Sequence, residues 1–131
     1  MDLNGYGPNG QVPGYPGFVY ASNLPNATIN DFDPKLPAVP CRLAIDNPAG
    51  PTTITGIKAG YDGQVLWIYY NGATSMTLSL GNTGSQPANR LIAPNGSITP
   101  VSLALNQGAN PVRLVYINQP SSILVPGWYP A

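Results

Sequence analysis

Residues 54–70, with the sequence ITGIKAGYDGQVLWIYY, decide the fold that we expect. Residues 52–57 are rich in β-branched side chains, which are typical of a strand, and residues 60–63 (GYDG) are typical of a tight turn. Residues 65–70 are apolar on both alternating faces, which indicates a strand that is covered on both sides. Asn71-Gly72 then supplies another turn. The stretch therefore predicts a hairpin at the centre of a β-sandwich.

Glycine and proline occur throughout the chain, with 15 and 16 copies among 131 residues. Because both residues destabilise helix interiors, we expect almost no helix. Short apolar or alternating segments between Gly, Asn and Pro turns predict an all-β fold, namely an antiparallel β-sandwich that is jelly-roll-like. In the segment 75–80 the inward residues would be Met76, Leu78 and Leu80. The other strands are expected at residues 42–45, 89–93, 97–105, 112–117 and 122–125.

The first part of the chain has a different composition. Residues 1–51 hold nine of the sixteen prolines, spaced so closely that neither a helix nor a central strand is expected. A disordered tail is one interpretation; an extended arm that docks on a neighbour is the other. We favour the arm because a solvated tail is usually charged and poor in aromatic residues. Its expected anchors are Tyr6, Tyr15, Phe18 and Tyr20. The β-sandwich domain would then span residues 52–131.

The charge balance excludes several partners. Five basic and five acidic residues give no net charge, so we expect no attraction to nucleic acid or to an anionic membrane surface. No apolar run is long enough for a membrane helix, and the first residues lack the pattern of a secretory signal. We therefore expect synthesis in a cytoplasm. Low charge combined with 43% hydrophobic residues favours a protein that hides surface in an assembly.

Groups for catalysis are scarce, and we expect no enzyme activity, cofactor or metal. The chain has neither histidine nor glutamate. Asp31 and Asp33 form the only close carboxylate pair; an acid–base pair or a weak calcium site is conceivable there, but a solvated loop is favoured. Asp62 is expected to accept backbone N–H groups in its turn. Cys41, the only cysteine, is expected to be a small buried hydrophobe.

The order of several short motifs resembles a small β-sandwich module of tailed-bacteriophage virion proteins. The similarity covers about 80 residues, 52 to 131. The residues that carry it are Gly56-Ile57, Asp62-Gly63-Gln64, Leu66, Ile68, Asn71-Gly72, Thr77-Leu78, Asn89-Arg90, Pro94-Asn95-Gly96, residues 112–116 and Trp128. In that family the module occurs in tail fibres, in spikes and in capsid-bound decoration or cement proteins, commonly as trimers.

The resemblance implies a virion structural protein. A tail fibre normally carries a long stalk upstream, and this chain has a Pro-rich arm instead, which suits a decoration protein on the capsid surface. The expected partners are then the major capsid protein and further copies of this chain in a homotrimer. The alternative is a tail-fibre or tail-tip module that recognises host surface glycans. A carbohydrate-binding domain of non-viral origin is a third class.

Several further side chains have two interpretations. Trp67 is expected in the core, with a ligand platform as the alternative. For Tyr69, Tyr70 and Tyr116 we favour core or subunit-interface positions over a carbohydrate-binding face. The expected interface residues are Arg90, Arg113, Trp128 and Tyr129. The two arginines would bond across subunits or pair with an aspartate, and Trp128-Tyr129 would close the sandwich or contact a neighbour.

Overall fold

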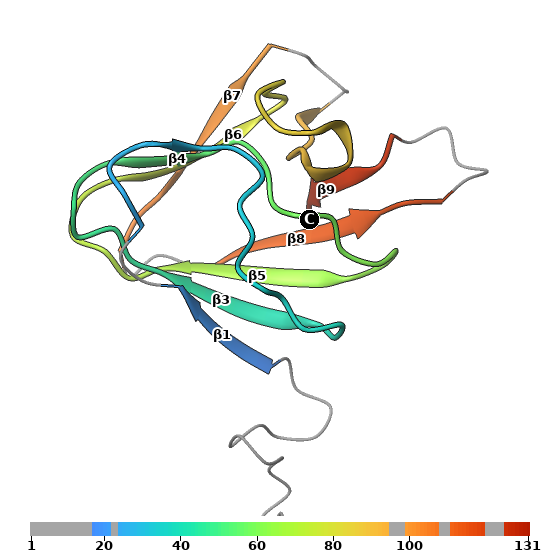
Figure 1. The fold of residues 1–131 in the computed structure, drawn as a ribbon, viewed down its shortest axis with the longest axis horizontal. Helices are drawn as coiled ribbons and strands as arrows, with labels where there is room; N and C mark the ends of the chain where they lie inside the picture. Colours follow the sequence, from blue (N-terminus) through green and yellow to red (C-terminus); the bar gives the residue numbers. More distant parts are fainter. Residues whose placement is uncertain (1–16, 22–23, 95–98, 108–110, 120–124) are drawn as a thin grey trace, which may run out of the picture.

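The computed structural model describes residues 17–21, 24–94, 99–107, 111–119 and 125–131, which form two β-sheets packed face to face (Figure 1). Within these ranges there is no α-helix, so the all-β prediction is confirmed. The elements are β1 (Gly17–Ala21), β2 (Thr28–Ile29), β3 (Cys41–Ile45), β4 (Thr52–Ile54), β5 (Val65–Tyr70), β6 (Met76–Leu80), the 3₁₀ helix η1 (Pro87–Asn89), β7 (Val101–Leu105), β8 (Val112–Ile117) and β9 (Gly127–Pro130).

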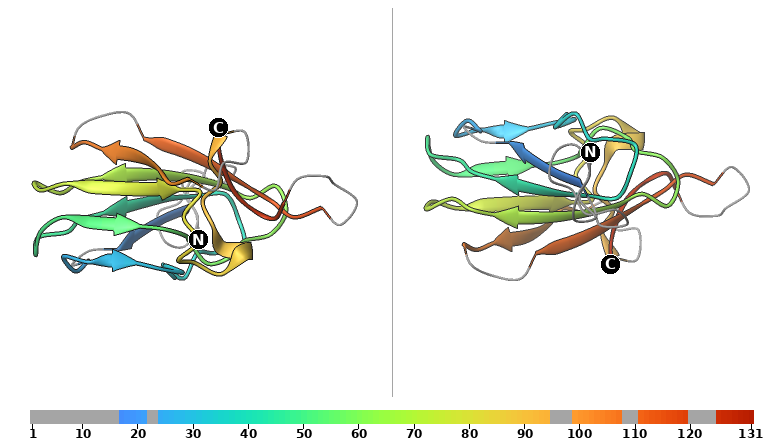
Figure 2. Two further views of the ribbon diagram at one scale, coloured as in Figure 1. Left: turned by 90° about the horizontal axis from the view of Figure 1, so that it is seen from above. Right: turned by 90° about the horizontal axis from the view of Figure 1, so that it is seen from below.

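The first six strands alternate between the two sheets. The five-stranded sheet has the order β1-β3-β5-β8-β9, and the four-stranded sheet has the order β2-β4-β6-β7. Strands β1, β3 and β5 are parallel, as are β2, β4 and β6. Paired residues on successive turns of this winding are 24 or 25 positions apart in the sequence. Figure 2 shows the two sheets from above and below, with the parallel strands stacked turn upon turn.

The last three strands are antiparallel additions. β7 pairs with β6 in the four-stranded sheet, and β8 and β9 extend the five-stranded sheet beyond β5. Both sheets are therefore mixed, and four of the seven strand pairs in the described ranges are parallel. The expected antiparallel, jelly-roll-like arrangement is not the one observed.

The predicted central hairpin is wrong because the chain changes sheets after β4. Thr52–Ile54 belongs to the four-stranded sheet and Val65–Tyr70 to the five-stranded sheet. Between them, Ile57 N–H donates to Asn89 O at 2.8 Å and Lys58 N–H donates to Phe32 O at 2.8 Å. These bonds draw the backbone toward the loops before β3 and after β6. The expected turn does form, with Gly63 at φ 85°, but it leads into β5 from the other sheet.

The remaining strand predictions have mixed outcomes. Strands at 42–45, 75–80 and 112–117 are confirmed, and Met76, Leu78 and Leu80 are buried. The strand expected at 89–93 is wrong: η1 occupies its start, and residues 90 and 91 form only isolated bridges. Most of the segment 122–125 lies outside the described residues, and β9 was not expected as a strand.

The sandwich begins well before residue 52, so the expected arm is too long. β1 pairs with β3, β3 pairs with β5, and β2 pairs with β4. Leu24 and Phe32 are also buried in the core. Of the expected anchors, Tyr6 and Tyr15 lie outside the described residues. Phe18 and Tyr20 belong to β1, where their backbone partners are Arg42 and Ala44.

The core lies between the sheets. Alternate residues of β3, β5 and β8 point inward from one sheet, and those of β4 and β6 point inward from the other. Trp128 closes one end of the core, with its ring edge-on to Tyr116 at a centroid distance of 5.0 Å. The fully buried residues with the largest side chains are Trp128, Tyr116, Leu43, Ile45, Ile54, Ile57, Leu66, Ile68, Met76, Leu78, Leu91 and Leu114.

Candidate binding site

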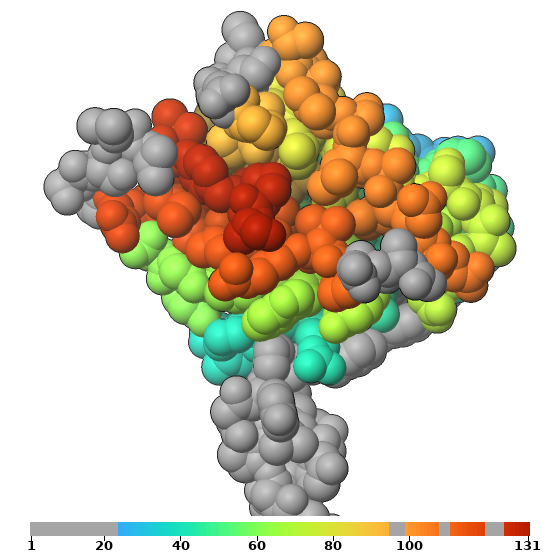
Figure 3. Space-filling view, turned by 180° about the vertical axis from the view of Figure 1, so that it is seen from behind, coloured from blue at the N-terminus to red at the C-terminus, as the bar shows by residue number. Residues whose placement is uncertain are grey.

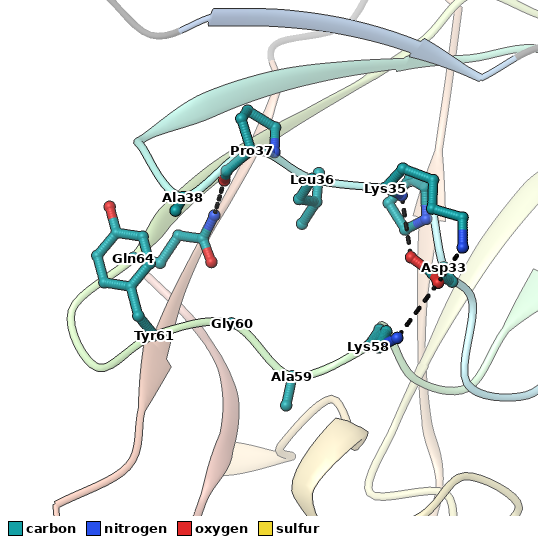
Figure 4. A pocket seen from close by; sticks show the side chains of 11 residues that line it. Asp33, Lys35, Leu36, Pro37, Ala38, Lys58, Ala59, Gly60, Tyr61 and Gln64 are labelled. Carbon is teal, nitrogen blue, oxygen red and sulfur yellow. Dashed lines mark hydrogen bonds and ion pairs between the residues drawn. The ribbon is translucent and has the colours of Figure 1, made fainter.

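A cleft of about 520 Å³ lies between residues 33–38 and residues 58–64 (Figure 4). The first segment connects β2 to β3, and the second connects β4 to β5. Both connections carry the chain from the four-stranded to the five-stranded sheet, on successive turns of the parallel winding. The bridge between Phe32 and Ile57 fixes their register. Two segments that are distant in sequence are thereby held opposite one another.

One end of the cleft is charged. Asp33 Oδ2 lies 2.9 Å from Lys35 Nζ and 3.5 Å from Lys58 Nζ, and Lys35 N–H donates to Asp33 Oδ1 at 3.0 Å. The hydrogen bonds from the Lys35 side chain and backbone lower the pKa of Asp33, so its carboxylate stays ionised at neutral pH. Two ammonium groups and one carboxylate leave this cluster with a net charge of about +1. These are the only two lysines in the chain.

The other end of the cleft is neutral. Gln64 is only 2% exposed, and its Nε2 donates to Pro37 O at 3.0 Å and to Val39 O at 3.3 Å. Because only the NH₂ group can face two carbonyl oxygens, the side-chain oxygen Oε1 is turned toward Gly60 and the cleft (Figure 4). A Cβ atom at residue 60 would overlap this oxygen, so glycine keeps the space open. Tyr61, 40% exposed, stands beside this end.

The other two carboxylates of interest have structural partners. Asp31 Oδ1 accepts from Gln86 N–H at 2.7 Å and from Asn89 Nδ2 at 2.9 Å. Asp31 therefore bonds to the loop after β6, whereas Asp33 pairs with Lys35 and Lys58. The two carboxylates do not point toward a common site as an acid–base pair would. Asp62 Oδ1 accepts the backbone N–H of Asn118 at 2.9 Å, so the structural role predicted for it is confirmed, although the donor lies in a distant loop.

Cys41 and the carboxylates are the remaining candidates for a reactive thiol and for metal ligands. Cys41 is fully buried, as predicted, and burial raises the pKa of its thiol to about 11. A thiol with this pKa is almost entirely protonated at neutral pH and is a poor nucleophile. Across the described ranges, no three His, Cys, Asp or Glu side chains lie close enough together to hold a metal ion.

The expected interface residues separate into two groups. Trp128 is fully buried and closes the sandwich, which is one of its two predicted roles. Arg90 is used within the chain, because its Nε donates to Ser85 O at 3.0 Å and a terminal nitrogen lies 3.4 Å from Thr83 O. Tyr129 is half-buried, and its hydroxyl donates to Val125 O at 2.7 Å. Arg113 is exposed.

Arg113 lies on the outer face of the five-stranded sheet. Trp67 is its register partner on β5, and Tyr69 follows two residues later on the same face. Both aromatic side chains are half-buried, so the prediction that Trp67 belongs to the core is wrong. Tyr70 and Tyr116 face inward, as favoured from the sequence. Seen from behind, the surface is formed mainly by β7, β8 and β9, with parts of β5 and β3 below them (Figure 3).

Comparisons with known proteins return no relative. No protein-family model matches the chain, and neither the curated proteins nor the solved structures yield a match. Among the described residues, none of the helical structure has the length and apolar character needed to cross a membrane.

The cleft was missed from the sequence. Lys35 and Lys58 are 23 residues apart, and nothing local in either segment indicates that they meet. It is the strand pairing in the structure, with its 24- or 25-residue offset, that brings the segment after Phe32 beside the segment after Ile57.

Proposed function

We propose that this chain is a non-catalytic bacteriophage virion structural protein, a capsid decoration or cement protein that binds the assembled head and bridges capsomers. The motif order quoted above supports the virion class. The observation that carries the proposal is an edge and a face that a partner could cover. Among the described strands β1 is at the edge of the five-stranded sheet, and the outer face of that sheet carries partly exposed aromatic side chains.

An edge strand offers backbone N–H and C=O groups to a partner. A strand from a neighbouring protein can add to such an edge, and its main-chain hydrogen bonds give affinity without charge. Trp67 and Tyr69 lie on the nearby outer face and supply aromatic contact area, which is typical of the residues that dominate binding energy. A chain with no net charge suits this mode of attachment.

Residues 1–16 precede this edge in the sequence. They contain Tyr6, Tyr15 and three prolines, with Asp2 as their only charged side chain. An extended segment of this length spans roughly 50 Å at about 3 Å per residue. In this proposal the segment extends from the edge strand to a neighbouring subunit of the shell.

Binding of this protein would stabilise the head because binding and shell assembly are linked equilibria. A protein that binds the closed shell, and not free subunits, shifts the equilibrium toward the shell. A homotrimer would attach through three copies of the same surface, which raises avidity without strong single contacts.

Co-sedimentation with undecorated heads of the source phage tests this function. We expect the full chain to sediment with heads, and we expect Trp67→Ala and a deletion of residues 1–16 each to weaken binding at least about tenfold. Tyr61→Ala, in the cleft, is the matched control and should bind as the unchanged chain does. If the unchanged chain stays in the supernatant, the decoration function is wrong. If only the deletion has no effect, the arm has no part in attachment.

The second candidate is a tail-fibre or tail-tip module that recognises host surface glycans. The observation that favours it is the cleft, where the exposed Tyr61 ring stands near polar groups. Binding of the chain to host cells, lost in Tyr61→Ala, would favour this candidate over decoration.

A further inference from the structure

The cleft between residues 33–38 and 58–64 has two chemically different ends. Figure 4 shows Gln64 and Tyr61 at one end, the Asp33–lysine cluster at the other, and Leu36, Ala59 and Gly60 between them. A volume of about 520 Å³ falls within the range of small-molecule sites. A ligand that fills this cleft must therefore satisfy an aromatic and neutral end as well as a cationic end.

Gln64 provides an unused acceptor at the neutral end. Its side chain is almost fully buried and is fixed by the two bonds from Nε2 to Pro37 O and Val39 O. In the part of the chain that the structure describes, no hydrogen bond reaches Oε1. No buried side-chain oxygen or nitrogen among the described residues lacks a partner, so Oε1 is an atom that opens onto the cleft and not a buried, unpaired one. An oxygen held in place beside an open cleft is suited to a hydroxyl or N–H donor from a ligand.

The charged end selects an anion. Lys35 Nζ donates one N–H to Asp33, and Lys58 Nζ forms an ion pair with the same carboxylate at 3.5 Å. Both lysine side chains are largely exposed, so their other N–H groups can reach a ligand. Asp33 holds the two ammonium groups close together and reduces the charge of the cluster to about +1, which matches a single carboxylate better than a doubly charged phosphate.

The aromatic ring of Tyr61 adds a flat apolar surface beside the acceptor. Sugar rings combine an apolar face, which packs on an aromatic ring, with hydroxyl groups that donate hydrogen bonds. A free carboxylic acid would use only the lysines, and a neutral sugar would use only Tyr61 and Gln64. An acidic saccharide uses all of them.

We propose that this cleft binds an acidic saccharide, with a sugar ring against Tyr61, a hydroxyl donating to Gln64 Oε1, and a carboxylate accepting from Lys58 and Lys35. Such binding does not depend on whether the protein sits on a phage head or tail. The co-sedimentation test of head binding and the titration test of saccharide binding can therefore give negative results independently of each other.

A ¹H–¹⁵N NMR titration of the full chain tests the proposal, with digalacturonate as the acidic probe. Lactose is the neutral probe, and inorganic phosphate tests whether an anion alone suffices. We expect digalacturonate to bind with a Kd on the order of 1 mM and to shift amide signals of residues 33–38 and 58–64. Lactose and phosphate should bind at least about five-fold more weakly, because each satisfies one end only. Equal binding of lactose or phosphate, shifts elsewhere, or no shifts with digalacturonate would overturn the proposal.

Three variants assign the contacts. Lys58→Gln should weaken digalacturonate binding about five-fold and leave lactose binding unchanged, because Lys58 contacts only the carboxylate. Tyr61→Ser should weaken both sugars. Arg113→Gln is the matched control, since it removes one positive charge from an exposed position on the outer sheet face, and it should bind as the unchanged chain does. If Arg113→Gln weakens binding as much as Lys58→Gln, the attraction is a general charge effect and the proposed site is wrong.

Discussion

Trp128 and Ile57 are joined across 71 positions of sequence by a hydrogen bond from the indole Nε1 to the Ile57 carbonyl oxygen, 3.0 Å long and fully buried. Trp128 belongs to β9 of the five-stranded sheet, and Ile57 follows β4 of the four-stranded sheet. The bond therefore ties the last strand to the crossing between the sheets, and the edge-on contact with Tyr116 packs the Trp128 ring against β8 of its own sheet. This crossing also carries Lys58, so the same contact supports one wall of the cleft.

Replacing Trp128 with phenylalanine should lower the free energy of unfolding by about 3 kcal/mol. The change leaves the Ile57 carbonyl without its donor and opens a cavity beside Tyr116. Urea denaturation followed by circular dichroism measures the loss. Tyr129→Phe is the control on the next residue; it removes a bond to Val125 O at the surface and should cost less than about 1 kcal/mol. Equal losses in the two variants would contradict the role assigned to Trp128.

A second prediction concerns a buried polar cluster at the other end of β5. Tyr70 Oη donates to Asn47 Oδ1 at 2.6 Å, and Asn47 Nδ2 donates to Ser75 O at 2.7 Å. Tyr70→Phe should cost about 1–2 kcal/mol because it leaves the Asn47 oxygen unpaired. A double-mutant cycle with Asn47→Ala should show a coupling of at least about 0.5 kcal/mol in urea unfolding. Tyr69→Phe, on the outer face, should be nearly neutral, and strictly additive effects of Tyr70 and Asn47 would refute the cluster.

Two glycines should respond differently to alanine. A Cβ at Gly56 would lie 2.6 Å from the Asn89 carbonyl oxygen, so the backbone must shift, and we expect a loss of about 2–3 kcal/mol. Gly63 has φ 85° but nothing within 4 Å of its Cβ position, so only backbone strain of about 1 kcal/mol is expected. Thermal unfolding of the two variants, compared side by side, checks the order. A larger loss for Gly63→Ala would contradict the packing described for Gly56.

The buried thiol of Cys41 makes stability depend on pH. Its pKa in the folded chain is about 11, above its ordinary value of 9.0, because burial disfavours the thiolate. Stability from the neutral thiol is thus fully present below pH 9 and is lost as pH rises toward 11, by about 2–3 kcal/mol in total.

Comparison with Cys41→Ala isolates this effect from tyrosine ionisation in the same range. The difference in unfolding free energy between the two chains should be constant below pH 9 and should shrink above it. A thiol reagent at pH 8 should also modify the unchanged chain slowly, and rapidly once the chain is unfolded in urea. Rapid modification of the folded chain would contradict the burial of Cys41.

The fold class followed from local sequence, whereas the topology did not. Alternation at residues 75–80 and the turn at 60–63 reveal strands and turns, because they depend on neighbours in sequence. Which strand pairs with which is decided by contacts such as those of Ile57 with Asn89, some 30 residues away. The parallel pairing of β1 to β6 therefore could not be predicted from the sequence of any one segment.

The candidate site was hidden for the same reason. Asp31 and Asp33 were expected in a solvated loop, and nothing in the sequence singled out Lys35 or Lys58. The bridge between Phe32 and Ile57 is what brings Asp33 and Lys58 together. Trp67 was misplaced because a strand that is apolar on both faces does not show which face meets the second sheet.

Immunogold electron microscopy with antibody against this chain tests the proposed decoration function most directly. It is applied to intact virions of the phage that, under the proposal, carries this protein. Gold spread over the head is the result that we predict. Gold confined to the tail tip would contradict decoration and favour receptor recognition, and virions without gold would contradict the virion assignment itself.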